Sequence, residues 1–290
     1  MKGPLQAGQV INRTYTIEAL VGTGAFGEVY LVSHRFLGQQ ALKVLKAGPE
    51  AGFEDVLAEA RLLVDLTHPN IVRIYDANVC DEFGKPFAFM AMEYAEGRTL
   101  ASLISTSIRL PDSTVVSIGM QVASALAETH ARNPPLLHRD IKPSNVLIFS
   151  EVHSLPVVKV SDYGMATTLD PETRLTRSAG TIAFAPPEMA WGVTDQRGDV
   201  YSLGVTLYRA LTGVHPFPLT SPEELSASRQ FTHVLTNGRR SIAPPSKLLM
   251  RRSNQLDAVV MKCLEFDLFA RFRDGAELLG ALRDVAGSSV

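Results

Sequence analysis

One stretch near the middle of the chain constrains its fold more than any other. Residues 136–149 read Leu-Leu-His-Arg-Asp-Ile-Lys-Pro-Ser-Asn-Val-Leu-Ile-Phe, a polar island between two apolar runs. Pro143 prevents a regular helix through the island and removes one backbone donor. The second apolar run predicts a short strand. The stretch is therefore predicted to be a loop held at both ends by buried chain, which is where catalytic groups are commonly found.

A glycine-rich segment near the start of the chain is the second constraint. Residues 21–29 read Val-Gly-Thr-Gly-Ala-Phe-Gly-Glu-Val, with glycines at 22, 24 and 27. Missing side chains allow backbone N–H groups to approach phosphate oxygens closely. A dinucleotide-binding turn would open a helix and a Walker loop would end in Gly-Lys-Ser/Thr, whereas here residues typical of a strand follow. The segment is predicted to join two antiparallel strands, either as a phosphate-binding loop or as an ordinary glycine-rich hairpin.

Lys43 lies inside the apolar run Gln-Ala-Leu-Lys-Val-Leu at residues 40–45. Its neighbours predict a strand in which the lysine stem is buried and the ammonium needs a partner. Apolar residues then recur at helical spacing over residues 53–64, and Glu59 shares their face. Lys43 and Glu59 are therefore predicted to form an ion pair, with a strand-surface lysine as the alternative.

The remaining elements are predicted from hydrophobic periodicity and from proline positions. The expected strands cover residues 14–21, 29–32, 40–45, 71–74, 87–93 and 157–160. The expected helices cover residues 53–64, 111–131, 199–211 and 275–285, with a short one starting at Leu100.

The polar island resembles the catalytic loop of protein kinases, because it reads H-R-D-I-K-P-S-N. Other family motifs follow in the family's order: the glycine-rich loop, Asp162-Tyr163-Gly164, and a closing segment over residues 180–188. This resemblance implies an α+β, bilobal protein-kinase fold, covering about residues 15–282. The small antiparallel β-sheet lobe with one main helix would cover residues 1–95, and the larger, mostly helical lobe residues 96–290.

The resemblance also implies a role for each polar residue of the site. Asp140 would orient the hydroxyl that is phosphorylated, and Lys142 would neutralise charge on the transferred phosphoryl group. Asn145 and Asp162 would bind Mg²⁺ through oxygen atoms. Lys43, fixed by Glu59, would hold the α- and β-phosphates of ATP.

Nucleotide binding would involve residues from both halves of the chain. Met92 resembles the residue behind the adenine, while Glu93 and Ala95 would bond the adenine edge through their backbone. The other nucleotide-binding positions implied by the resemblance are Val21, Gly22, Gly24, Gly27, Val29, Ala41, Leu147 and Asp162.

Serine/threonine specificity is indicated by Lys142, two residues after the catalytic aspartate, and by Thr181, which would order substrate and catalytic loop. The hinge at residues 93–100 resembles that of bacterial members. Three hydroxyls, those of Thr173, Thr176 and Ser178, are candidate phosphorylation sites, because Arg139 would attract a phosphate there. Solvated loop hydroxyls are the alternative.

Two further residues would support the site. Asp199 would hold the backbone of the catalytic loop, although it also suits the start of a helix. Arg271 would pair with Glu188 at the end of the closing segment. The chain departs from the usual family residues at Tyr163 for phenylalanine, Pro186 for alanine and Phe272 for proline.

Composition narrows the partners. The formal net charge is −2 over 290 residues, without a long basic run, which argues against nucleic acid. Two isolated cysteines indicate a reducing compartment. No apolar run is long enough to span a membrane and residues 1–6 lack the apolar stretch of a signal peptide, so we expect a cytoplasmic protein.

The predicted function is that of a serine/threonine protein kinase using ATP and Mg²⁺ on protein substrates, which also phosphorylates its own activation segment. One alternative is a nucleotide-binding pseudokinase or signalling scaffold, but Lys43, Asp140, Asn145 and Asp162 are all present. The other is a phosphotransferase for small molecules, against which the full closing segment argues. The oligomeric state is not predicted.

Overall fold

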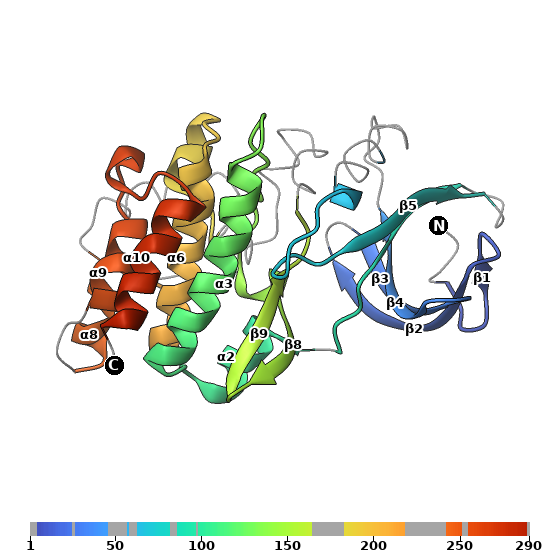
Figure 1. Ribbon diagram of the computed structural model, residues 1–290, viewed down its shortest axis with the longest axis horizontal. Coiled ribbons are helices and arrows are strands. Elements are labelled where there is room, and N and C mark those ends of the chain that lie inside the picture. The colour runs from blue at the N-terminus through green and yellow to red at the C-terminus, as the bar shows by residue number, and fades with distance from the viewer. Residues whose placement is uncertain are drawn as a thin grey trace, which may run out of the picture. The chain divides into compact units, whose positions relative to one another are not determined.

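The computed structural model (Figure 1) describes residues 5–24, 27–45, 57, 63–81, 86–96, 98–163, 183–217, 242–250 and 255–288. Its described residues up to Glu96 form one compact unit, and those from Arg98 onwards form a second. The first unit is built mainly of strands and the second mainly of helices, which makes the chain α+β.

The first unit contains a six-stranded antiparallel sheet in the order β1-β2-β3-β4-β6-β5. Its strands are β1 (Val10–Ile11), β2 (Tyr15–Gly24), β3 (Gly27–His34), β4 (Gly38–Leu45), β5 (Ile74–Cys80) and β6 (Phe87–Met92). Alternate residues of β2 and β3 pack into the hydrophobic core, which also contains Leu42 and Phe89. The predicted strands at the glycine-rich segment are present and longer than expected.

The strand predicted over residues 71–74 is wrong. The regular strand instead begins at Ile74, where the prediction ended, and runs to Cys80. β5 is an edge strand of the sheet, with Tyr75 exposed and Asp76 half-buried. An edge strand is partly solvated and does not need a continuous apolar run, so the polar residues of β5 concealed it.

The second unit is a group of helices with a small antiparallel sheet in the order β7-β8-β9. Its helices are α2 (Leu100–Ser107), α3 (Asp112–His130), α6 (Gln196–Thr212), α8 (Pro245–Leu248), α9 (Gln255–Cys263) and α10 (Gly275–Gly287). The strands are β7 (Arg98–Thr99), β8 (Val146–Val152) and β9 (Leu155–Val160). Helix α3 packs against α10, α6 and β9, as Figure 1 shows.

Helix α6 is central to the second unit, since its residues are buried from Gly198 through Tyr208. It begins three residues before the predicted Asp199, because the side chain of Asp195 accepts from the N–H of Arg197 and caps the helix. Helices α8 and α9 were not predicted. None of the described helices has the length and apolar character needed to cross a membrane.

Candidate active site

Asp199, in the first turn of α6, anchors the backbone of the predicted catalytic loop. Its Oδ2 accepts from the N–H of His138 and its Oδ1 from the N–H of Arg139, each at 2.7 Å. Burial alone would raise the pKa of this carboxyl. The hydrogen bonds from the His130 ring and from the backbone N–H of His138 outweigh burial, so the pKa is lowered. An ionised carboxylate therefore holds the loop, in the role that the resemblance implies.

Two buried histidines extend this anchor. His130, at the end of α3, lies with Nε2 3.1 Å from Oδ2 of Asp199, and its Nδ1 accepts from the N–H of Gly275 at 3.2 Å. The ring of His138 accepts from the N–H of Asp140 at Nδ1, and its Nε2 donates to the carbonyl oxygen of Ser161 at 2.8 Å. Hydrogen bonds therefore connect the catalytic loop with α3, α6, α10 and the residue before Asp162.

The Asp140 carboxylate is held by two neighbours from its own loop. Its Oδ2 lies 2.9 Å from Nζ of Lys142 and accepts from Nδ2 of Asn145 at 3.1 Å. Nδ2 of Asn145 also donates to the Asp140 carbonyl oxygen at 2.8 Å. The Asp140 side chain is 4 % exposed, so these contacts fix its orientation. Within the described residues both contacts go to Oδ2, which leaves Oδ1 as the oxygen able to accept from a bound hydroxyl.

Asn145 and Asp162, the two predicted metal ligands, supply only hard oxygen atoms. Because Nδ2 of Asn145 is engaged by Asp140, its Oδ1 is oriented as the acceptor. Asn145 lies on the short 3-10 helix η1 (Pro143–Asn145), and the Ser161 N–H donates to its carbonyl oxygen at 2.9 Å. This donor set suits Mg²⁺, which binds one or two protein ligands together with phosphate oxygens. In the described part of the chain, no cluster of three or more His, Cys, Asp or Glu side chains forms a metal site of another type.

Backbone conformation at two positions of the site is unusual. Arg139 has φ 64° and Asp162 has φ 63°, although neither is glycine. Such conformations cost about 1–3 kcal/mol each and persist where surrounding contacts enforce them. The bond from the Arg139 N–H to Asp199 is one such contact.

Glu188 and Arg271 form the predicted pair at the end of the closing segment. Two parallel hydrogen bonds of 2.7 and 2.8 Å join the guanidinium to the carboxylate. The side chain of Arg271 is 0 % exposed and that of Glu188 is 5 % exposed. The Arg271 guanidinium also lies 4.7 Å from the ring centroid of Tyr201. The end of the segment is thereby fixed to the second unit.

In the first unit, sheet register brings together several predicted nucleotide-binding residues. Gly22 lies opposite Val29, and Val29 lies opposite Lys43. Ala41, two residues from Lys43 on β4, lies opposite Met92 on β6. Residues directly opposite one another, or two apart, share a face of the sheet. Lys43 is buried, with 4 % of its surface exposed, as its apolar neighbours predicted.

The three glycines of the glycine-rich segment differ in what the fold requires. Gly27 has φ 151°, and a Cβ there would lie 1.9 Å from the carbonyl oxygen of Val44. Among the described residues, a Cβ at Gly22 would meet no atom within 4 Å, and one at Gly24 would meet only the Gly27 oxygen at 4.0 Å. Of these three positions, Gly27 is therefore the one at which described neighbours and backbone conformation demand glycine.

The remaining predicted nucleotide-binding positions vary in exposure. Met92 is buried at the end of β6, and the N–H of Glu93 is engaged with the carbonyl oxygen of Arg73 at 2.9 Å. Ala95 and Leu147 are half-buried and Val21 is exposed. An adenine bond from Glu93 would therefore use its carbonyl oxygen.

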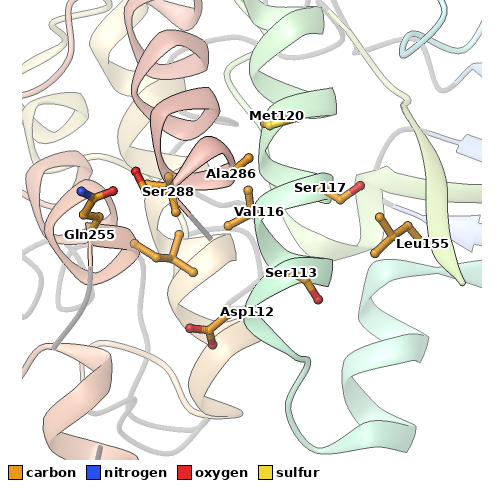
Figure 2. Close-up of a pocket in the computed structure, with 11 residues that line it drawn as sticks. Asp112, Ser113, Val116, Ser117, Met120, Leu155, Gln255, Ala286 and Ser288 are labelled. Atoms are coloured by element: carbon orange, nitrogen blue, oxygen red, sulfur yellow. The ribbon is translucent and has the colours of Figure 1, made fainter. Parts of the chain in front are cut away.

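A cavity of about 750 Å³ lies within the second unit, between α3, α10 and the start of α9 (Figure 2). Its walls include Val116, Met120, Leu256 and Val285. None of the residues predicted to bind ATP, Mg²⁺ or protein is among the described residues that line it. The sequence motifs, rather than this cavity, therefore locate the candidate active site.

Comparison with known proteins agrees with the motifs. The family model for the protein kinase domain matches residues 15–277. The chain belongs to the protein kinase family. A solved structure shows that the similarity extends over nearly the whole chain. The PknI kinase domain of Mycobacterium tuberculosis superposes with a TM-score of 0.71 at 26% identity, covering 98% of this chain and 100% of that one.

Two curated relatives of this kinase domain come from bacteria. A probable serine/threonine-protein kinase of Clostridium perfringens is 33% identical over 285 residues, covering 96% of this chain and 39% of the relative. The serine/threonine-protein kinase PknB of Mycobacterium leprae is 32% identical over 272 residues, covering 91% of this chain and 42% of the relative. The kinase domain thus spans about two-fifths of the length of these relatives.

Several predicted residues of the kinase lie outside the described part of the chain. They are Glu59, Gly164, Thr173, Thr176, Ser178 and Thr181, so the Lys43–Glu59 pair and the phosphorylation sites stay predictions. The helix predicted over residues 53–64 is described only at Leu57, Leu63 and Val64, which are helical.

The supporting roles of His130 and His138 were not predicted from the sequence. His130 lies one residue beyond the predicted apolar stripe of α3, and a polar side chain in that last buried turn was the available signal. His138 was read only as part of the motif, because nothing in the local sequence shows that its ring reaches Ser161.

Proposed function

We propose that this kinase domain transfers the γ-phosphoryl group of ATP to serine or threonine hydroxyls of proteins. The observation that carries the proposal is the buried Asp140 carboxylate, oriented through Oδ2 by Lys142 and Asn145. An oriented carboxylate in the catalytic loop of a protein kinase has one chemical use, which is to accept a hydrogen bond from the attacking hydroxyl.

Asp140 orients that hydroxyl through Oδ1 and takes its proton as the new P–O bond forms, while the bond from the γ-phosphorus to the oxygen of the leaving ADP breaks. Lys142 lies beside the same carboxylate, where its ammonium neutralises charge on the transferred group. Because Asn145 fixes the carboxylate through Nδ2, neither group has to reorganise during the transfer.

ATP and Mg²⁺ are proposed as cofactors because the oxygen-only set of Asn145 and Asp162 suits Mg²⁺. Asn145 and Asp162 would hold Mg²⁺, which would neutralise phosphate charge. Lys43 holds the α- and β-phosphates, and open space at Gly22 and Gly24 admits phosphate oxygens to the backbone. Glu59 would orient Lys43.

Serine/threonine specificity is supported by Lys142 and by the names of the Clostridium and Mycobacterium relatives. Thr181 is proposed to order the substrate, and Thr173, Thr176 or Ser178 to receive an activating phosphate that Arg139 binds. A cytoplasmic location is likewise a proposal from the sequence.

The test is transfer of labelled phosphate from γ-labelled ATP with Mg²⁺ to myelin basic protein, followed by phosphoamino-acid analysis. We expect phosphoserine or phosphothreonine with the parent protein and a loss of at least about a hundredfold with Lys43→Met. Nucleotide binding without transfer would instead identify a pseudokinase, and label on small alcohols but not on protein would identify a small-molecule phosphotransferase.

A further inference from the structure

His215 follows α6 on a loop and contacts the closing segment. Its Nε2 lies 2.6 Å from the carbonyl oxygen of Ala183, and its ring meets that of Phe184 edge-on at a centroid distance of 5.6 Å. Ala183 comes two residues after Thr181 and is the first described residue of the segment. This contact joins residues 32 positions apart in the chain, so local sequence does not reveal it.

The chemistry of the contact fixes which nitrogen carries the proton. A carbonyl oxygen only accepts, so Nε2 of His215 must be the donor. Nδ1 then accepts from the N–H of Phe217 at 3.3 Å; the Phe217 carbonyl oxygen, 3.1 Å from Nδ1, would accept a bond only from a doubly protonated ring. Burial lowers the pKa of His215 to about 4, and the charge of Arg209 acts in the same direction. The ring is therefore neutral at neutral pH.

The closing segment is held at more than one point. The Arg209 guanidinium, from α6, lies 6.0 Å from the ring centroid of Phe184, which is buried. Arg271 grips Glu188 at the other end. Side chains thus fix Phe184 and Glu188, and among the described residues His215 donates to the backbone of Ala183.

We propose that His215 is a positioning residue for the protein substrate, acting by fixing the backbone at the start of residues 183–188. The proposal rests on the proposed function, because it assumes that the segment presents a protein to Asp140. Among the described residues, His215 makes no hydrogen bond or ring contact with a residue predicted to bind ATP or Mg²⁺. We therefore expect its loss to affect binding of the protein substrate and not binding of ATP.

The consequence is a separation of two Michaelis constants. Losing the donor leaves the Ala183 carbonyl oxygen without its bond to His215, which weakens the hold on the segment's backbone. We therefore expect the KM for a protein substrate to rise about tenfold in His215→Asn, whose amide is too short to reach Ala183. His215→Gln, which keeps a donor at a similar distance from the backbone, should stay within about threefold of the parent. The KM for ATP should change in neither variant.

The experiment measures kcat and KM for myelin basic protein and for ATP with the parent, His215→Asn and His215→Gln. His153→Ala, at an exposed histidine of the β8–β9 turn, is the matched control. Parental protein KM in His215→Asn would overturn the inference, and so would an equal rise in both variants or a parallel rise in the KM for ATP. If the parent itself phosphorylates no protein, the proposed function fails instead.

Discussion

The catalytic loop and the glycine-rich segment serve the same proposed reaction but are built by opposite means. Around Asp140, charged and polar side chains are buried and connected by hydrogen bonds to Asp199, His138 and Asn145. At Gly22 and Gly24, by contrast, side chains are missing, and among the described residues no atom lies closer than 4.0 Å to the place that a Cβ would take. The catalytic loop is fixed by hydrogen bonds between polar groups, whereas the glycines leave room for a ligand.

Because of this difference, substitutions in the two regions should affect different properties of the protein. A buried polar network is costly to interrupt, because each group left without its partner loses both water and protein bonds. A segment in open space tolerates an added methyl group sterically, so its effect falls on ligand approach. Changes in the network should therefore appear as stability or rate, and changes at the open glycines as nucleotide affinity.

The largest stability effect is expected at the buried ion pair of Glu188 and Arg271. Arg271→Ala leaves the Glu188 carboxylate buried without its cation, which should lower the free energy of unfolding by about 3–5 kcal/mol. Urea denaturation measures this loss. Arg273→Ala, two residues on, removes an exposed partner of Asp274 and should give a change too small to resolve. Similar losses in the two variants would break the contrast between buried and exposed charge.

A smaller loss of stability is expected for Gly27→Ala, and almost none for Gly24→Ala. Gly27→Ala forces a side chain onto φ 151° and against the Val44 oxygen, so we expect at least about 2 kcal/mol of destabilisation. Gly24→Ala should leave the melting temperature nearly unchanged and weaken ATP binding instead. Thermal unfolding and ATP titration on both variants decide this. A Gly24→Ala protein that melts as early as Gly27→Ala would contradict the open-space account.

The smallest effect is a pH dependence from His215. Its pKa is lowered from 6.5 to about 4 in the folded protein, so between these values the unfolded chain binds more protons. Stability therefore falls as the pH falls, with a contribution from His215 of about 1.5 kcal/mol between pH 6.5 and 5. His215→Gln should remove this share, which urea denaturation at the two pH values measures. An unchanged pH slope would show that the ring is not buried in neutral form.

Local chemistry explains how much of this could be predicted from the sequence. Asp140, Lys142 and Asn145 stand within six positions, so a motif captured them together. The pairing of Glu188 with Arg271 came from resemblance, because 83 residues separate them. His130 and His215 act through contacts 69 and 32 residues away, and no local pattern encodes such contacts. Most of β5 was not predicted, because an edge strand tolerates polar residues.

The Asp140 carboxylate is proposed to assist phosphoryl transfer without contributing to ATP binding. Single-turnover transfer to myelin basic protein and ATP affinity, measured on the same Asp140→Asn preparation, test it most directly. We expect a transfer rate lower by about a thousandfold, with ATP affinity and melting temperature close to those of the parent. Transfer at the parental rate would contradict it.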